Sequence, residues 1–437
     1  MSLESEVDLP GGAVLPGALP EMLRTELIAF RRDLHMHPEL GNQEFRTTAA
    51  IKERLERAGL APRVLSSGTG IICDIGVTDG TGIAADAPAD TDAPADIDTP
   101  AGIDTPAGIG TDTGILALRA DIDGLPIPDM KTGCPYRSTV PDRAHACGHD
   151  VHTTVVLGAG LVLAELHRQG LLPRPVRLIF QPAEEVLPGG ASEAIVDGAL
   201  DGVGRIIAVH CDPRVDAGRI GLRQGPITSA CDRLEIALDG PGGHTARPHL
   251  TTDLVTAAAR VVTDVPALVG RRVDSRSGLA VTWGRIESGH APNVIPQHAE
   301  LSGTVRCLDL NTWLLAPDLV VAAIDEVANL HGAKSEINYV RGVPPVVNED
   351  GVTELLRDAM IARRGSDSVE STEQSLGGED FSWYLERVPG AMARLGVRPP
   401  GERTVRDLHQ GDFDVDEHAI TVGVELFTAA ALLDALR

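Results

Sequence analysis

Five side chains that can bind a metal ion lie within the stretch HACGHDVHTT, at positions 145–154: His145, Cys147, His149, Asp150 and His152. The 437-residue chain holds only 14 histidines and six cysteines, so this clustering is informative. Cys147 and His149 are two residues apart, and in an extended stretch both side chains would leave the same face of the backbone. The stretch predicts either a metal site or a packed polar cluster, and the rest of the chain must distinguish the two.

Further candidate ligands follow predicted strands. Glu184 and Glu185 follow the apolar run VRLIFQPA, His210 closes IIAVH, and His409 lies in RDLHQGDFD near the C-terminus. Ligand sites in open α/β sheets gather at the carboxyl ends of the strands, so these side chains are expected to meet at one edge. One glutamate of the pair would be a ligand.

Each of these signals has a plainer interpretation. A single histidine at a strand end is more often a hydrogen-bonded core residue, and adjacent glutamates are usually solvated. A metal site is favoured because a thiolate, imidazoles and carboxylates are all expected at one sheet edge. This mixed donor set suits Zn²⁺, Mn²⁺, Co²⁺ or Ni²⁺ better than Mg²⁺ or Ca²⁺, which prefer oxygen alone.

The composition excludes several classes of partner. A net charge of −25 argues against nucleic acid and anionic membrane as partners, and 3% aromatic residues make nucleobase stacking platforms unexpected. The sequence has no apolar run of the roughly 18 residues that a membrane span needs. The six cysteines have no disulfide-framework spacing, and the first residues have no basic segment followed by an apolar one. We therefore expect a cytoplasmic protein.

Two domains are expected, because the chain is too long for one compact core. Up to residue 227, predicted helices (within 21–60, 153–166 and 191–197) alternate with predicted strands (70–76, 114–123, 176–185 and 204–212). This alternation indicates an α/β sheet with helices on its faces. From 228 to 342 the order is βαββαβ, which is typical of a ferredoxin-like α+β domain. Residues 343–437 would complete the first domain.

Residues 78–113 differ from the rest of the chain in composition. They consist mainly of Asp, Ala, Pro, Gly and Thr, and IDTPAG occurs twice in tandem. Such a segment has too little apolar area to offset its ordering entropy. We interpret it as a mobile acidic hairpin insertion of no assigned role.

Nine motifs occur in order over nearly the whole chain: RRDLHMHPEL, RADIDGLP, HACGHDVHT, FQPAEE, GGHTARPH, APNVIP, GTVR, GGEDF and LHQGDFDVDE. In these the sequence resembles the aminoacylase, hippurate hydrolase and auxin-conjugate (IAA-amino acid) hydrolase branch of the metal-dependent amidohydrolase–carboxypeptidase family. The resemblance implies a catalytic α/β domain with a mixed sheet flanked by helices. It also implies an inserted ferredoxin-like lid domain that forms a homodimer.

The resemblance also implies roles for individual residues at a site for two divalent metal ions. Glu184 would be the general base, and Cys147 would bridge the two ions. Arg119-Ala120-Asp121 stands where the wider superfamily reads His-x-Asp, so this motif supplies no ligand imidazole, and Asp121 would orient the ligands. Asp150, His145 and His152 would support the ligand loop. The chain also lacks the proline usual after the last ligand, His409. The implied ligands are Cys147, His149, Glu185, His210 and His409.

In the lid, the resemblance gives His244 an oxyanion-supporting role across the dimer interface. Asn293 and Arg306 would hold the free carboxylate of the substrate, and Gly378 would offer it a backbone amide. The plainer alternatives are that His244 only hydrogen-bonds within a glycine-rich turn and that Arg306 is an exposed charge at a strand end.

The predicted function is therefore hydrolysis of N-acyl-amino acids to a carboxylate and a free amino acid. A water acidified by the metal ions would attack the amide, and a carboxylate beside it would carry the proton to the leaving amine. The alternatives are a dipeptidase or carboxypeptidase on the same scaffold and a non-catalytic binding relative. Loss of the base or of ligands would indicate the last, and all of these residues are present.

Overall fold

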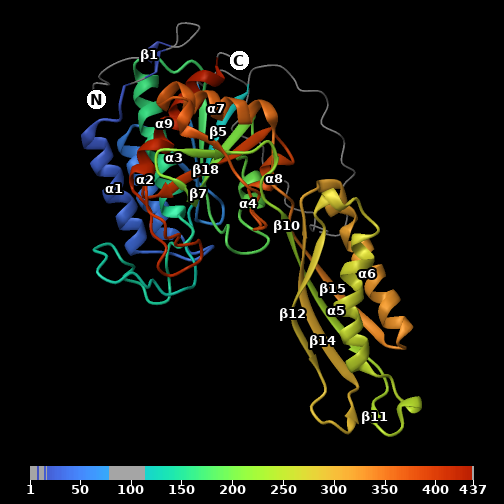
Figure 1. Ribbon diagram of the computed structural model, residues 1–437. Helices are drawn as coiled ribbons and strands as arrows, with labels where there is room; N and C mark the ends of the chain where they lie inside the picture. The colour runs from blue at the N-terminus through green and yellow to red at the C-terminus, as the bar shows by residue number, and fades with distance from the viewer. Residues whose placement is uncertain (1–6, 9–13, 16, 78–113, 436–437) are drawn as a thin grey trace.

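The computed structural model describes residues 7–8, 14–15, 17–77 and 114–435. The predicted acidic insertion at 78–113 lies outside the described residues. Figure 1 shows a larger body of helices around a sheet, from which a smaller sheet with two helices extends. Six of the short elements lie outside the two main sheets: β1 (Val7–Asp8), β2 (Val14–Leu15), β9 (Gly225–Pro226), β11 (Gly243–His244), β13 (Val294–Ile295) and β16 (Val347–Asn348).

The larger body is built on an eight-stranded mixed sheet of order β17-β8-β18-β7-β5-β6-β4-β3. Its central strands β18, β7, β5 and β6 are parallel to their neighbours in this group, while β4 and β3 are antiparallel additions. This confirms the predicted α/β class. The strands are β3 (Arg63–Val64), β4 (Ile71–Ile75), β5 (Ile115–Asp121), β6 (Val176–Gln181), β7 (Val203–Asp216), β8 (Ile220–Leu222), β17 (Val369–Ser371) and β18 (Gly390–Arg398).

Helices cover both faces of this sheet. Alternate side chains of β5 show the division, because Leu116 and Leu118 belong to the core under the larger group of helices while Ile115 and Ala117 belong to the opposite core. The larger group is α1 (Glu21–Met36), α2 (Phe45–Arg57), α3 (His149–Arg168), α7 (Asp350–Arg364) and α9 (His418–Asp434). The other face carries α4 (Ala191–Val196) and α8 (Ser382–Leu385).

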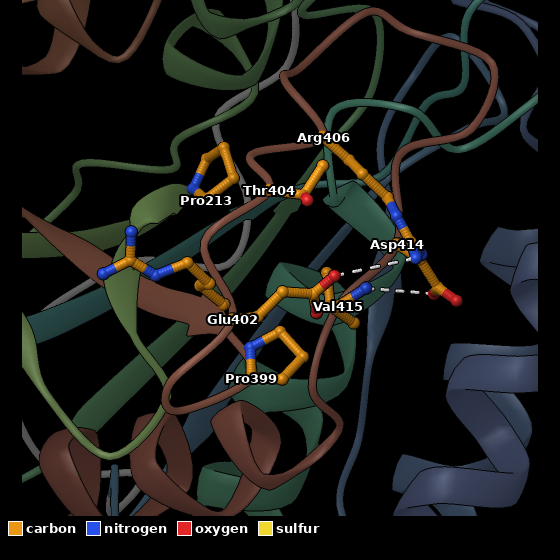
Figure 2. Close-up of a pocket in the computed structure, with 8 residues that line it drawn as sticks. Pro213, Pro399, Glu402, Thr404, Arg406, Asp414 and Val415 are labelled. Carbon is orange, nitrogen blue, oxygen red and sulfur yellow. Dashed lines mark hydrogen bonds and ion pairs between the residues drawn. The ribbon is translucent and has the colours of Figure 1, made fainter.

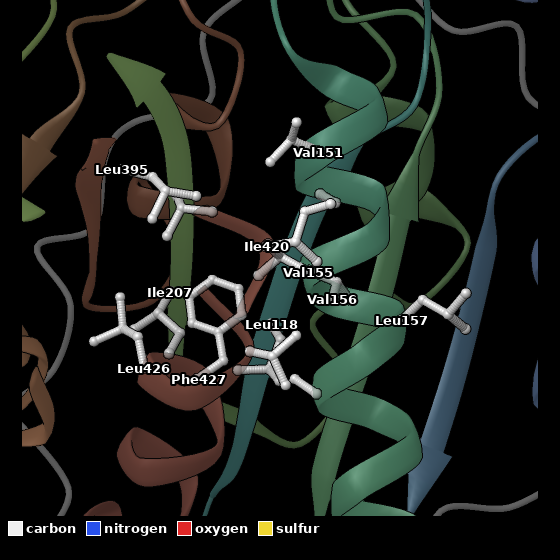
Figure 3. Close-up of a cluster of buried hydrophobic side chains, with 14 of the residues drawn as sticks. Leu118, Val151, Val155, Val156, Leu157, Ile207, Leu395, Ile420, Leu426 and Phe427 are labelled. Carbon is white, nitrogen blue, oxygen red and sulfur yellow. The ribbon is translucent and has the colours of Figure 1, made fainter. Parts of the chain in front are cut away.

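Helix α3 lies at the centre of the larger core. Figure 3 shows Val151, Val155 and Val156 of α3 facing Leu118 of β5 and, beyond it, side chains of β7, β18 and α9. The N-terminal turn of α3 is therefore fixed against the carboxyl ends of three strands. None of the described helices is both long enough and apolar enough to cross a membrane.

The smaller body is a four-stranded antiparallel sheet of order β12-β14-β10-β15 with its own core. Chain order is βαββαβ, and the two helices pack on one face of the sheet. Two chain segments connect it to the larger body, and they pair with each other through β9 and β16. Its elements are β10 (Ala230–Asp239), α5 (Leu254–Gly270), β12 (Ala280–Ser288), β14 (His298–Cys307), α6 (Leu310–Leu330) and β15 (Lys334–Val343).

Two predicted boundaries near the candidate ligands were wrong. The helix predicted from Thr153 begins at His149, so His149 lies in a helical turn and not in an extended stretch. The strand predicted to reach Glu185 ends at Gln181, so both glutamates lie in the turn that follows. A residue with a left-handed conformation lies near each boundary: Gly148 (φ 88°) directly precedes α3, and Ala183 (φ 58°) lies two residues after β6.

Candidate metal centre

A pocket of about 450 Å³ lies where the two bodies meet, beside the turn that follows β6 and beside His210 and Arg394, which lie within β7 and β18. The chain brings four of the five predicted metal ligands into its lining, and His149 adjoins them from the first turn of α3. Residues that line it include Cys147, Glu184, Glu185, His210, Cys231, Arg306, Gly378, Glu379, Arg394 and His409.

The five predicted ligands form two groups that share Cys147. The ligand atoms of Cys147, His149 and His210 lie within 4.8 Å of one another, and so do those of Cys147, Glu185 and His409. Cys147 Sγ is 3.6 Å from His210 Nε2, and His409 Nε2 is 3.2 Å from Glu185 Oε1. A thiol common to two groups of donors is the geometry that a bridging ligand requires.

The backbone around Gly148 brings Cys147 and His149 together. A Cβ on residue 148 would lie 2.7 Å from Cys211 Sγ and would need a left-handed conformation. Glycine alone therefore allows α3 to begin directly beside Cys147. The sequence predicted the pairing of Cys147 with His149 correctly, but the physical reason is this turn and not an extended strand.

Two carboxylates hold the turn that carries Glu184 and Glu185. Glu44 Oε1 accepts a hydrogen bond from the Ala183 amide at 2.8 Å, and Asp123 Oδ2 accepts one from the Glu185 amide at 3.0 Å. The two glutamates diverge from this turn. Glu184 approaches Glu379 and Asp380, whereas Glu185 approaches the Cys147 and His409 side chains.

His149 and His210 are oriented in the same way. The Nδ1 atom of His149 lies 3.1 Å from Asp123 Oδ1, and the Nδ1 atom of His210 lies 2.9 Å from the Cys211 carbonyl oxygen. Each Nδ1 therefore has a partner that accepts its proton, and each Nε2 faces the other candidate ligands. This is the usual arrangement of metal-binding imidazoles, in which a partner on the second nitrogen fixes the tautomer.

His152 is occupied on both ring nitrogens. Its Nε2 accepts from the Cys211 amide at 2.8 Å, and its Nδ1 is 2.6 Å from Asp121 Oδ1. Asp121 also accepts from Arg119 at 2.8 Å and lies 3.8 Å from His149 Nε2. His152 and Asp121 thus hold the Cys211 backbone and the His149 ring in position below the candidate ligands.

Asp150 lies outside the pocket, in a buried ionic cluster under α3. Its Oδ2 is 2.7 Å from Arg31 Nε and 2.7 Å from His35 Nδ1. His145 is also buried, and its ring nitrogens have no hydrogen-bond partner among the described residues. The contacts of Asp150 with Arg31 and His35 hold the first turn of α3 on the side away from the pocket.

Sequence reasoning missed Asp123, which holds both His149 and Glu185. The signal was present in the run Ala120-Asp121-Ile122-Asp123, because residues two apart in a strand share a face. Both aspartates therefore continue toward the same edge of the sheet as the candidate ligands.

Burial and neighbouring carboxylates shape the electrostatics of the pocket. Burial raises the pKa of the Cys147 thiol well above its usual value, and Glu185 and Glu184 raise it further. Burial also raises the pKa of Glu184, with Glu379 as the next cause. Burial by itself would lower the pKa of His149, but Asp121 and other carboxylates raise it to about 10. The pocket therefore attracts a cation.

The donor atoms fit divalent metal ions. His149 Nε2 is buried and makes no hydrogen bond to any described residue, and Glu185 Oε1 forms ion pairs only with the rings of His409 and His149 in the same part of the chain. A buried polar atom without a hydrogen bond is costly, and a metal ion would satisfy both of these atoms. The set of one thiolate, three imidazoles and one carboxylate matches metals that accept nitrogen, oxygen and sulfur ligands.

The loop between β18 and α9 carries His409. His409 itself has a left-handed φ of 62°, and its amide donates to the Ala146 carbonyl oxygen at 2.8 Å, which ties the loop to the start of the ligand cluster. Figure 2 shows another part of this loop, where Arg406 pairs with Glu402 at 3.9 Å. The pocket drawn there holds only about 80 Å³, too little for a substrate.

The residues predicted to contact the substrate fall into two groups. Arg306 and Gly378 line the pocket, and Arg306 Nη1 donates to the Leu376 carbonyl oxygen. His244 and Asn293 do not line it. They lie beside β11 and β13, at the tip of the smaller body farthest from the larger sheet (Figure 1). There the His244 ring accepts from the Ala246 amide at 3.0 Å.

Known proteins resemble the chain over nearly its full length. A putative glutamate–cysteine ligase of Rhodococcus jostii is 43% identical over 95% of this chain, which spans about half (47%) of that relative. An N-acetyl-L-cysteine deacetylase of Bacillus subtilis is 36% identical over 91% of this chain and 85% of its own length. The Bacillus subtilis YxeP protein, described as a dinuclear metal-binding peptidase, is 31% identical with a TM-score of 0.75, covering 95% and 99% of the two chains.

The model of peptidase family M20/M25/M40 matches residues 117–433, a span that contains every candidate ligand described above. The expected resemblance to metal-dependent amidohydrolases is thus confirmed. The chain belongs to the M20/M25/M40 peptidase family.

Proposed function

We propose that this protein hydrolyses the amide bond of N-acyl-amino acids, releasing a carboxylate and a free amino acid, with two divalent metal ions. The observation that carries the proposal is the sharing of Cys147 between two groups of donors at the mouth of one pocket. A deacetylase of N-acetyl-L-cysteine and a dinuclear metal-binding peptidase are among the relatives that support it.

The two ions would be held by the five predicted ligands, with the Cys147 thiolate between them. When bound, they supply Lewis-acid polarisation of the scissile carbonyl and lower the pKa of the attacking water. Zn²⁺, Mn²⁺, Co²⁺ and Ni²⁺ all suit the donor set. The ligands are Cys147, His149, Glu185, His210 and His409.

Glu184 acts as the proton carrier. Its Oε2 lies 3.9 Å from His149 Nε2, so the carboxyl group borders the ligand cluster and faces the pocket. It accepts a proton from the attacking water and delivers that proton to the leaving nitrogen. Burial and the neighbouring Glu379 raise the pKa of Glu184, and a higher pKa makes its carboxylate a stronger proton acceptor than a solvated one.

Substrate recognition comes from the smaller body, residues 228–342, which we propose as an inserted lid and dimerisation domain between catalytic segments 1–227 and 343–437. Arg306 of this body and Gly378 of the second catalytic segment meet the substrate in the pocket of their own subunit. His244 and Asn293 lie at the far tip, so they serve the pocket of a partner subunit, in which His244 supports the oxyanion. A two-fold dimer makes this exchange reciprocal.

Six cysteines lie among the described residues and none is paired in a disulfide. This supports the proposal that the protein works in the cytoplasm, where thiols stay reduced.

A substrate screen tests the function. The protein is stripped with a chelator and loaded separately with Zn²⁺, Mn²⁺, Co²⁺ or Ni²⁺, then given N-acetyl-, N-benzoyl- and indole-acetyl-amino acids beside dipeptides. Released amino acid is measured by chromatography. We expect metal-dependent release from N-acyl-amino acids. Cleavage of dipeptides alone would favour the peptidase alternative, and no cleavage with any metal would refute the proposal.

A further inference from the structure

Arg394 is a buried arginine in the wall of the pocket. It lies in β18 and is 6% exposed. In the parallel register of β18 and β7 it is the partner of His210, so the two side chains lie side by side on one face of the sheet. The Arg394 side chain therefore enters the pocket beside a candidate metal ligand.

The structure gives Arg394 no hydrogen bond and no ion pair with any described residue. Among the described residues four arginines are buried, and the other three are held by carboxylates. Arg31 lies 2.7 Å from Asp150, Arg119 lies 2.8 Å from Asp121, and Arg177 lies 2.6 Å from Asp74. Arg394 is thus the exception within the described part of the chain.

An unpaired buried guanidinium is energetically unfavourable. Arginine stays protonated in proteins, and a charge removed from water needs a counter-charge and hydrogen-bond acceptors. Burial lowers the pKa of Arg394, although Asp212 and Glu379 oppose this from a distance. Such an arrangement is tolerated where an anion from solution completes it.

We infer that Arg394 binds a carboxylate group of the substrate inside the pocket. The inference rests on the proposed function, which supplies a substrate that carries a carboxylate. A guanidinium offers a planar fork that matches a carboxylate with two parallel hydrogen bonds. Arg306 faces the same pocket from the smaller body, but its Nη1 already donates a hydrogen bond to the Leu376 carbonyl oxygen. Arg394 is therefore a specificity-determining residue of the larger body.

The substrate carboxylate could be the α-carboxylate or a second one on the side chain, and three substrates of nearly equal size separate these sources. N-acyl-glutamate carries both carboxylates, N-acyl-glutamine only the α-carboxylate, and N-acyl-glutamine amide neither. The acyl group is the one preferred in the substrate screen. We would measure kcat/KM for each with the metal-loaded wild type and with Arg394→Met.

Arg394→Met should reduce kcat/KM at least about 30-fold for each substrate that carries the bound carboxylate and less than about 3-fold for the others. If the loss of kcat/KM is large for N-acyl-glutamine but small for N-acyl-glutamine amide, Arg394 binds the α-carboxylate. If the loss is large for N-acyl-glutamate but small for N-acyl-glutamine, Arg394 binds the side-chain carboxylate. An equal loss on all three substrates would overturn the inference. Arg394→Lys, which keeps the charge but not the fork, should recover part of the loss.

Arg398→Met is the matched control, because Arg398 lies on the same strand, pairs with Asp216 at 2.7 Å and lines the other pocket. It should leave the preference among the three substrates unchanged. A changed preference in this variant would show that the strand as a whole is perturbed and would count against Arg394.

Melting temperature gives a readout that does not need turnover. Without ligand, Arg394→Met should melt at or above the wild-type temperature, because a costly buried charge is gone. N-acyl-glutamate should raise the melting temperature of the metal-loaded wild type but not of the variant. A variant that melts lower and keeps the ligand shift would refute the inference. If no N-acyl-amino acid is hydrolysed, the proposed function fails, while this shift still decides the role of Arg394.

Discussion

The stability of the protein should depend on the protonation of Glu44, the residue that holds the turn before Glu184. Glu44 is fully buried, Oε1 accepts from the Ala183 amide, and Oε2 has no partner among the described residues. Burial raises the pKa of Glu44 from 4.5 to about 7, and Asp123 adds to the shift. The folded protein thus binds this proton more tightly than the unfolded chain does.

Because the folded pKa of Glu44 lies above the unfolded one, its contribution to stability is fully present below about pH 4.5 and is lost as pH rises through 7. Each unit of pKa shift corresponds to about 1.4 kcal/mol, so between pH 5 and pH 8 the wild type should lose about 2.5 kcal/mol on account of this group. Glu44→Gln removes the titration but keeps an oxygen that can accept from Ala183.

Urea unfolding of wild type and Glu44→Gln, followed by circular dichroism from pH 5 to pH 8, measures this loss. The free energy of unfolding of the variant, relative to the wild type, should rise by about 2.5 kcal/mol across the range. Other titrating groups and bound metal affect both proteins and cancel in the difference. Glu53→Gln, at an exposed site in α2, the helix that directly follows Glu44, is the control and should give a flat difference. A flat difference for Glu44→Gln as well would refute the reasoning.

Three further predictions concern the site itself. Glu184→Gln should lower kcat about 100-fold or more while elemental analysis finds the metal retained, since it removes the proton carrier but no ligand; near-normal turnover would exclude Glu184. Cys147→Ala should lose bound metal and activity together, and two tightly held ions in that variant would exclude a bridging role. Mixing inactive His244→Ala with inactive Glu184→Gln under subunit exchange should restore up to about half of the wild-type activity per dimer, because one site would then be intact. Verified heterodimers without activity would confine His244 to its own chain.

The position of the site was predictable from the sequence because it depends on a general property of α/β sheets. Glu185 follows a buried apolar run that ends at one edge of the parallel strands. His210 was expected to end its strand in the same way, but β7 continues to Asp216, so this expectation was wrong although His210 still lies beside the other candidate ligands. His409 could be placed only by its motif. No local pattern predicts that its amide reaches Ala146, which is far away in the sequence.

What the sequence could not predict depends on tertiary contacts. The start of α3 at His149 requires Gly148 to pass close to Cys211, and a helix pattern that began at Thr153 contained no sign of that contact. Arg394 was missed for a similar reason. The run AMARLGV predicts a strand in which Arg394 would be half-exposed. Only the register with His210 shows that Arg394 is buried beside the candidate ligands.

The carboxylates around the pocket affect whether Arg394 can bind an anion. Arg119 pairs with Asp121, Glu379 and Asp380 at the floor, so one cation faces three carboxylates, while Glu184 and Glu185 form ion pairs only with histidines among the described residues. The combined field of these carboxylates would repel a substrate carboxylate from Arg394 until cations occupy the donor groups. Metal binding therefore does more than supply the chemistry: it changes the pocket from one that attracts cations to one in which Arg394 can hold an anion. The unpaired Arg394 and the excess of carboxylates are therefore complementary: the metal ions balance the carboxylates, and the carboxylate of the substrate balances Arg394.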